Sequence, residues 1–217
     1  MQVTHAGQAM TLSVDTVFVA GWTGRDPAAV QHHIDELAEL GIAPPSQVPL
    51  YYRVSNALLT QDPLIEVLGE TSSGEVEPLL VQQDGKLWLG LASDHTDRAL
   101  EAHSVAASKQ ACLKPMGYEV WAFDDIKDDL ETMILRCNIR ENGGWVTYQE
   151  GTLAAIRPLA DLMAGADFTG NAAMLCGTLG AIGGVRPAAA YQMTLEDPKR
   201  GRTITLDYSV RTLPIVA

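Results

Sequence analysis

Apolar and polar residues alternate along much of the chain in short runs, with the period of two that is typical of β-strands with one buried face. The first run is Thr11–Ala20, and after residue 49 come LYYRV, LIEVLGE, VEPLLVQQ and KLWLGLAS. Asp84-Gly85, between the last two, predicts a hairpin turn. Later runs predict one hairpin over Thr132–Asn138 and Gly144–Gln149 and another over Ala190–Leu195 and Thr203–Val210.

Three segments have the apolar period of a helix instead. Asp26 as N-cap and Pro27 in the first turn predict a helix over Ala28–Leu40, which ends before Gly41. Shorter helices are predicted over Ala99–Ala107 and Leu153–Ala164. Since no repeat or low-complexity linker interrupts the pattern, residues 1–217 are expected to form one domain of the α+β class, dominated by β-structure, with a few helices on curved sheet.

Composition and charge narrow the classes of protein and partner. With 47% hydrophobic and 19% charged residues, the chain can bury a sizeable core. The formal net charge of −12, with no cluster of Lys and Arg, disfavours nucleic acid as a partner. No apolar run is long enough to span a membrane, and residues 1–10 do not resemble a signal peptide, so we expect a cytoplasmic protein without a membrane partner. Three widely spaced cysteines predict free thiols.

The first candidate site is Glu75-Val76-Glu77, at the start of an apolar strand. Residues i and i+2 of a strand point to the same face, so the two carboxylates project together. Carboxylate oxygens are ligands of hard cations, which favours Mg²⁺, or else Mn²⁺ or Ca²⁺. The alternative is a solvated face of an edge strand.

The second candidate is the polar cluster that follows the strand LWLGLAS. Asp94 could supply a third oxygen ligand, and Arg98 could bind a substrate carboxylate with two hydrogen bonds. Alternatively, Asp94 is the N-cap of the next helix and Arg98 its partner on the surface.

The remaining candidates are His33 with Glu36, Lys109 and Thr178. His33 and Glu36 lie one helical turn apart, so the carboxylate could orient the imidazole as a general base; the alternative is a surface pair on an amphipathic helix. Lys109 could stabilise a developing enolate or carboxylate, although most lysines are solvent-exposed. Gly177-Thr178 could offer N–H groups and a hydroxyl to an anion, but the segment does not match a phosphate-binding loop.

The order of these motifs resembles the fumarylacetoacetate hydrolase family over nearly the whole chain. The motifs that carry the resemblance are His33-Ile34-Asp35-Glu36, PLYYR at Pro49–Arg53, Glu75-x-Glu77, Ser93-Asp94-His95-Thr96-Asp97-Arg98, Lys109 ahead of Pro115-Met116-Gly117, and Gly177-Thr178. The resemblance implies a β-rich roll of mixed sheets around a divalent metal, usually Mg²⁺. It also implies a homodimer, and substrates that are 2-oxo or 1,3-dicarbonyl acids.

The same resemblance implies roles for individual residues. Glu75, Glu77 and Asp94 would hold the metal, and His33 with Glu36 would activate water or move a proton. The residues implied to bind the substrate carboxylate or stabilise developing negative charge are Lys109, Arg98 and Thr178, with further substrate contacts from Tyr51 and Arg53. The reactions known in the family are C–C bond hydrolysis, decarboxylation, hydration, isomerisation and the dehydration of sugar acids.

The sequence also departs from the family pattern. Ser93 replaces Asn, Asp97 replaces Ala, and Glu101 stands where the family has Gln, which places a negative charge near the expected substrate carboxylate.

The motifs and the resemblance lead to three hypotheses. The first is a metal-dependent enzyme acting on a small oxo-acid, with C–C hydrolysis ahead of dehydration or decarboxylation. The second is a binding protein that keeps the metal and anion pocket without turnover. The third is that the match is coincidental and the carboxylates lie on the surface.

Overall fold

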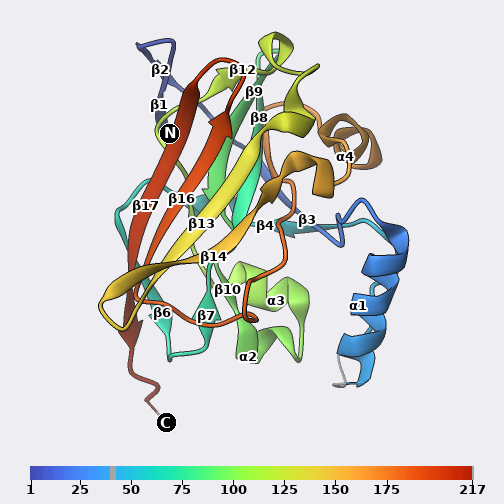
Figure 1. The fold of residues 1–217 in the computed structure, drawn as a ribbon, viewed down its shortest axis with the longest axis vertical. Coiled ribbons are helices and arrows are strands. Elements are labelled where there is room, and N and C mark those ends of the chain that lie inside the picture. Colours follow the sequence, from blue (N-terminus) through green and yellow to red (C-terminus); the bar gives the residue numbers. More distant parts are fainter. Residues whose placement is uncertain (40–42, 217) are drawn as a thin grey trace.

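Two β-sheets packed against each other form the body of the protein (Figure 1). A computed structural model describes residues 1–39 and 43–216, without the side chains of residues 33, 36 and 37. One sheet has six strands in the order β12-β9-β8-β15-β3-β4, and the other has five in the order β14-β13-β16-β17-β6. Both are mixed, because β15 is parallel to β3 and β17 is parallel to β6, whereas the other neighbouring strands are antiparallel.

The elements have the following bounds. The six-stranded sheet contains β3 (Thr16–Gly21), β4 (Leu50–Val54), β8 (Val76–Gln83), β9 (Lys86–Ser93), β12 (Trp121–Ala122) and β15 (Ala172–Leu175). The five-stranded sheet contains β6 (Leu64–Leu68), β13 (Ile134–Glu141), β14 (Gly144–Thr152), β16 (Ala190–Asp197) and β17 (Arg202–Leu213). Three strand pairs complete the β-structure: β1 (Gln2–His5) with β2 (Gln8–Thr11), β5 (Leu59–Thr60) with β11 (Lys114–Pro115), and β7 (Ser72–Ser73) with β10 (Thr96–Asp97). The α-helices are α1 (Pro27–Glu39), α2 (Arg98–Glu101), α3 (Val105–Gln110) and α4 (Leu159–Gly165).

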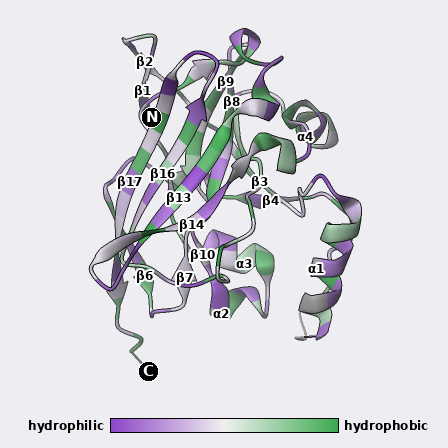
Figure 2. Ribbon diagram, in the orientation of Figure 1, coloured by the Kyte–Doolittle hydropathy of each residue, from purple (hydrophilic) through white to green (hydrophobic). Residues whose placement is uncertain are grey.

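The alternation of side chains in β8 divides the core into two parts. Leu80 belongs to the core between the two sheets, together with Leu135 and Leu206 of the five-stranded sheet. Leu79 and Val81 point to the opposite face and belong to a second cluster. Figure 2 shows green, apolar stretches along the strands that alternate with paler and purple ones. The six-stranded sheet therefore buries both of its faces, which explains the nearly continuous apolar run in β8.

Most predicted strands are confirmed. LYYRV, VEPLLVQQ and KLWLGLAS correspond to β4, β8 and β9, and both later hairpins are present. The turn at Asp84-Gly85 has φ of +51° and +73°, and such positive values are required by the tight hairpin turn that this dipeptide favours. The β-dominated α+β class with few helices is thus confirmed.

Three predicted elements differ from the structure. The run from Thr11 is interrupted, since β2 ends there and β3 begins only at Thr16. The helix predicted over 99–107 is split into α2 and α3, because Ser104 accepts a hydrogen bond from the Ala107 N–H and so caps a second helix. The helix predicted from Leu153 begins only at Leu159, after Pro158. The predicted helix end at residues 40 and 41 lies outside the described residues.

Two further findings concern the cysteines and the helices. Cys112, Cys137 and Cys176 are buried and free, as predicted. No helix in the described part of the chain is long and apolar enough to cross a membrane.

Candidate metal centre

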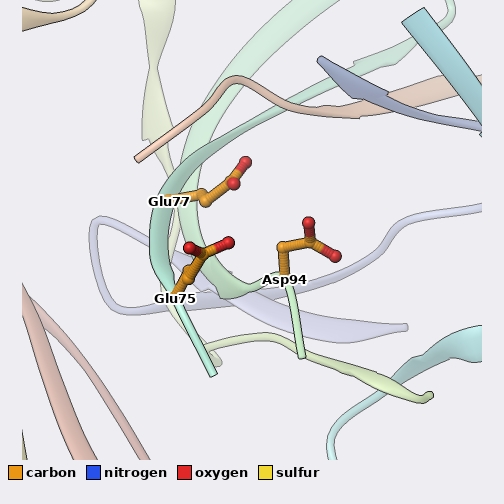
Figure 3. Close-up of side chains that lie close together, drawn as sticks. All are labelled: Glu75, Glu77 and Asp94. Carbon is orange, nitrogen blue, oxygen red and sulfur yellow. The ribbon is translucent and has the colours of Figure 1, made fainter. Parts of the chain in front are cut away.

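Three carboxylates converge where β8 begins and β9 ends. Glu75, Glu77 and Asp94 each offer an oxygen, and these oxygens lie within 4.8 Å of one another (Figure 3). The strand register explains this: Val76 pairs with Ser93, and the Asp94 N–H donates to the Glu75 carbonyl at 3.0 Å. Asp94 therefore lies opposite Glu75, and Glu77 projects from the same face of the sheet two residues further along β8.

Two buried lysines contact Asp94 from the other side. The Lys109 ammonium is hydrogen-bonded to Asp94 Oδ2. The Lys114 Nζ lies 3.1 Å from Asp94 Oδ1 and donates to the His95 carbonyl at 2.6 Å. The side chains of Lys114 and Asp94 are both 0% exposed, and that of Lys109 is 8% exposed. The negative charge of the buried Asp94 is therefore balanced by two lysines that lie 15 and 20 residues further along the chain.

Burial and mutual contact shift the pKa values of this group. Burial would raise the pKa of Asp94, but Lys109 and Lys114 outweigh it and lower the pKa. Burial would lower the pKa of Lys109, but Asp94 outweighs it and raises the pKa. For Lys114, burial and repulsion by Lys109 outweigh the attraction of Asp94, and the pKa is lowered. Burial and the nearby Asp94 raise the pKa of Glu77 well above its usual range.

The donor set fits a hard divalent cation. Mg²⁺ prefers oxygen ligands at about 2.1 Å in octahedral geometry, which places two ligand oxygens roughly 3–4 Å apart. The three oxygens here all lie within 4.8 Å of one another, which allows such an arrangement. Asp94 Oδ1 is buried, and Lys114 Nζ lies 3.1 Å from it. Burial is the main cause that raises the pKa of Glu77, and the neighbouring Asp94 adds to it. A divalent cation beside Glu77 would favour its charged form, in which it can act as a ligand.

Arg98 is engaged by other residues of the chain. Its guanidinium lies 3.2 Å from Glu75 and 2.9 Å from Glu101, and its Nε donates to Ser73 Oγ at 2.7 Å. Asp97, and not Asp94, is the N-cap of α2, because its side chain accepts from the N–H groups of residues 99 and 100. The structure therefore brings Arg98 to the carboxylate cluster, where its guanidinium is paired with both Glu75 and Glu101.

Tyr51 and Arg53 lie on the opposite face of β4 from Tyr52. The Tyr51 hydroxyl is buried without a hydrogen-bond partner in the described part of the chain, and Arg53 lies over the Phe18 ring at 4.5 Å. Tyr52, which was not selected from the sequence, faces the cluster, since its ring centre is 5.7 Å from Lys109 Nζ. The structure therefore does not bring Tyr51 and Arg53 together with the carboxylates.

The segment after β15 contacts the cluster from a third direction. The Gly177 N–H donates to Glu77 Oε2 at 2.7 Å. Gly177 has φ of +97°, and an added Cβ would lie only 1.6 Å from Thr23 Oγ1, so glycine is required at this position. Thr178 donates its hydroxyl proton to the Val76 carbonyl at 2.7 Å. Thr178 is thus placed beside the residue that separates the two glutamates.

The remaining predicted residues are only partly described. His33 and Glu36 belong to α1, but their side chains lie outside the described residues, so their pairing stays a prediction. Lys114 and Gln149 were not selected from the sequence. A single Lys before Pro115 and a single Gln in a strand carry no spacing signal, and only the tertiary contacts indicate their place.

His95 is buried in a polar network next to Asp94. Its ring nitrogens contact Tyr208 Oη and Ser72 Oγ, both at 3.0 Å, and Tyr208 Oη lies 2.8 Å from Ser93 Oγ. Burial, together with Lys114 and Arg98, lowers the pKa of His95 to about 3. The imidazole is therefore neutral at physiological pH.

We predict that this histidine makes the metal-free protein acid-sensitive. Because its pKa falls from 6.5 to about 3 on folding, its contribution to stability is present above pH 6.5 and is lost as the pH falls toward 3. The loss is on the order of 5 kcal/mol. His95→Gln can keep hydrogen bonds but does not titrate, so its unfolding free energy, measured with urea in the presence of a chelator, should fall less steeply over this range. Parallel profiles for the two proteins would contradict the assignment.

Several solved structures have the same fold as this chain. A 2-keto-3-deoxy-D-arabinonate dehydratase complexed with magnesium and 2,5-dioxopentanoate has 14% identity and a TM-score of 0.64, covering 93% of this chain and 74% of that one. A 5-carboxymethyl-2-hydroxymuconate delta-isomerase from Mycobacterium smegmatis has 15% identity and a TM-score of 0.62, with 96% and 84% covered. A maleylpyruvate hydrolase from Sphingobium sp. SYK-6, in complex with manganese (II) ion and pyruvate, has 11% identity and a TM-score of 0.61, with 92% and 71% covered. The fold is that of fumarylacetoacetate hydrolase-like proteins, as the resemblance implied.

The sequence itself assigns the family. The model of the family described as "Protein of unknown function (DUF2848)" matches residues 20–208, and the chain belongs to this family. Among curated proteins, no sequence matches the chain.

Proposed function

We propose that the protein is a divalent-metal-dependent enzyme that acts on a small 2-oxo or 1,3-dicarbonyl acid. The observation that carries this proposal is the convergence of Glu75, Glu77 and Asp94 within 4.8 Å, backed by two buried lysines. Surface carboxylates would not need such compensation, because water screens them. The described geometry therefore favours a cation site over the coincidental surface cluster.

Two of the structures with the same fold support the choice of cation and substrate. The dehydratase is complexed with magnesium and 2,5-dioxopentanoate, and the hydrolase with manganese and pyruvate. Both organic molecules are small oxo compounds. We propose Mg²⁺ as the cation, with Mn²⁺ next and Ca²⁺ as the third candidate.

The residues around the cation site suggest how the chain contributes to the chemistry. A bound divalent cation would supply Lewis-acid polarisation of adjacent substrate oxygens. Because its pKa is raised, Lys109 is an ammonium at neutral pH, so it can stabilise negative charge that develops on the substrate but cannot act as a base. Lys114 is 0% exposed and holds Asp94 in place. Arg98 stays a proposed substrate contact beside the carboxylates. The Thr178 hydroxyl gives its proton to the Val76 carbonyl, so it has none to donate to a substrate carboxylate, and Tyr51 and Arg53 lie on the other face of β4.

For the reaction we propose hydrolytic cleavage of a C–C bond. Water adds to one carbonyl carbon, and His33, oriented by Glu36, takes the proton that the water loses. The C–C bond then breaks, its electron pair stays with the fragment that carries the second carbonyl, and that fragment takes up a proton. The products are a carboxylic acid and a smaller oxo-acid.

The alternative reaction is dehydration or decarboxylation on the same scaffold. Glu101, 2.9 Å from Arg98, favours dehydration of the two, because a carboxylate beside the guanidinium reduces the positive charge available for a second substrate carboxylate. A sugar acid carries hydroxyl groups in that part of the molecule, and hydroxyl groups can donate to Glu101. The likeness to the sugar-acid dehydratase points in the same direction.

A substrate panel with controlled metal content tests the proposal. Acylpyruvates, oxaloacetate and aldonates would be incubated with the protein plus Mg²⁺, Mn²⁺, Ca²⁺ or a chelator, and products followed by mass spectrometry. We expect turnover of an oxo-acid with Mg²⁺ or Mn²⁺ and none with the chelator. Thermal stabilisation by metal and ligand without any product would favour a binding protein, and turnover that survives the chelator would reject the metal-dependent mechanism.

His33→Ala should separate the metal from the proton transfer. We expect this variant to bind the metal with unchanged affinity and to lose most of the turnover, because the resemblance assigns His33 to water activation. The matched control is His32→Ala, the neighbouring exposed histidine, which should retain turnover. Calorimetric metal titration and initial rates measure the two effects, and full turnover in His33→Ala would remove the residue from the mechanism.

The expectation of a homodimer also stays a proposal. Light scattering of the purified protein measures its mass directly, against the 23.3 kDa of a single chain.

A further inference from the structure

Where the glutamates lie, β8 is paired with β9 on one side but has no neighbouring strand on the other side, where β15 has ended. Since the Glu75 carbonyl faces β9, both backbone groups of Val76 face the other way, toward β15. The pairing of β15 with β8 covers only Leu79–Gln82, and β15 ends at Leu175. The N–H and C=O of Val76 are therefore beyond the end of the ladder and need other partners.

Two side chains from distant segments provide them. Gln149 of β14 accepts from the Val76 N–H at 2.9 Å, and Thr178 donates to the Val76 carbonyl at 2.7 Å. Gln149 Nε2 in turn donates to Thr178 Oγ1 at 2.8 Å and to the Leu179 carbonyl at 2.7 Å. Val76, Gln149 and Thr178 thus form a closed ring of hydrogen bonds. Val76 is the single residue that separates Glu75 from Glu77.

This ring is rigid for a physical reason. Gln149 is 1% exposed, so a lost partner would leave a buried amide or a buried backbone group unsatisfied. The partners also fix the orientation of the Gln149 amide. The Val76 N–H can only donate and so requires the amide oxygen, whereas the Leu179 carbonyl can only accept and so requires the amide nitrogen. The adjacent Gly177 N–H donates to Glu77 Oε2, so the same loop holds both the backbone and one carboxylate.

We propose that Gln149 and Thr178 are positioning residues that hold Glu75 and Glu77 in the geometry of a cation site. The inference rests on the cation site of the proposed function. Thr178 acts through the Val76 carbonyl, to which it donates its hydroxyl proton. Gln149 belongs to the five-stranded sheet and accepts from the Val76 N–H, so it fixes the position of Val76 relative to that sheet. Neither residue needs to touch the cation.

The test compares two substitutions at the same position. Thr178→Val keeps the size of the side chain but removes the hydroxyl, whereas Thr178→Ser keeps the hydroxyl. We expect Thr178→Val to weaken Mn²⁺ binding, measured by calorimetry, by about 10–100-fold, the usual effect of losing an outer-shell partner of a metal site. Thr178→Ser should restore most of the affinity. Gln149→Met, which keeps the length but loses both hydrogen-bonding groups, should resemble Thr178→Val.

A destabilised control separates positioning from a general loss of stability. Leu195→Ala in β16 removes a buried side chain of the inter-sheet core, four residues along the strand from Tyr191 and the His95 network, and should lower Tm without changing Mn²⁺ affinity. Wild-type affinity in Thr178→Val and Gln149→Met would overturn the inference while leaving the proposed function intact. Equal affinity in the Val and Ser variants would also overturn it. A wild-type protein that binds no Mn²⁺ would reject the proposed function together with the inference.

Discussion

Glu77→Gln is expected to remove divalent cation binding without unfolding the protein. Glu77 is 2% exposed, and burial together with Asp94 raises its pKa well above the usual range. The amide oxygen of Gln can still accept from the Gly177 N–H, but it brings no negative charge to the cation. We therefore expect metal affinity to fall by more than the roughly 10–100-fold that loss of an outer-shell partner costs, with loss of metal-dependent turnover.

Although Glu77→Gln should weaken metal binding, it should not lower the stability of the metal-free protein. Because folding raises the pKa of Glu77, this residue costs the metal-free protein stability as the pH rises above 4.5, and Gln does not titrate. In the presence of a chelator, Glu77→Gln should therefore be at least as stable as the wild type at pH 7. Glu150→Gln on the exposed part of β14 is the control and should bind the metal normally. Unchanged metal affinity in Glu77→Gln would refute the assignment of this residue as a ligand.

Lys114→Met is expected to destabilise the protein strongly at neutral pH. It removes a cation that is 0% exposed, leaves Asp94 with Lys109 alone, and takes the hydrogen-bond donor from the His95 carbonyl. Breaking a buried ion pair by removing one partner costs about 3–5 kcal/mol, because the other charge stays buried. Because Lys109 still contacts Asp94, we expect the lower end of this range, measured by urea unfolding at pH 7 with a chelator present.

Lys199→Met is the matched control for that variant. Lys199 also pairs with an aspartate, Asp129, at 2.7 Å, but its side chain is 65% exposed, so its loss should cost less than about 1 kcal/mol. If the two lysine variants had the same unfolding free energy, Lys114 would not be needed to compensate the buried charge of Asp94.

The fold was predictable where local pattern and burial agree. In β4, β8 and β9 the apolar runs are bounded by turn residues, and the predicted segments coincide with the strands. The prediction was wrong where a side chain makes a local contact that periodicity does not show. Ser104 caps α3 and divides one expected helix into two, and the run from Thr11 to Ala20 contains two strands rather than one.

The candidate site was predictable only in part. The spacing of Glu75 and Glu77 suggested a shared face, and the position of Asp94 after an apolar strand made it a candidate third ligand. Nothing local connects residue 77 with residue 94, so only the resemblance placed the three together. Tyr51 and Arg53 were chosen from a motif, and strand alternation turns them to the other face of β4 from Tyr52. His33 and Glu36 stay predictions, because their side chains lie outside the described residues.

By itself, the amino-acid sequence determined which segments become strands and that two carboxylates point the same way, because both properties depend on a period of two within a few residues. Only the tertiary structure decided which charges meet. The contacts of Asp94 with Lys109 and Lys114, and the ring of Gln149 and Thr178 around Val76, join residues 15 to 102 positions apart. Such contacts follow from how the two sheets and the connecting loops pack, and long-range packing leaves no period in the chain.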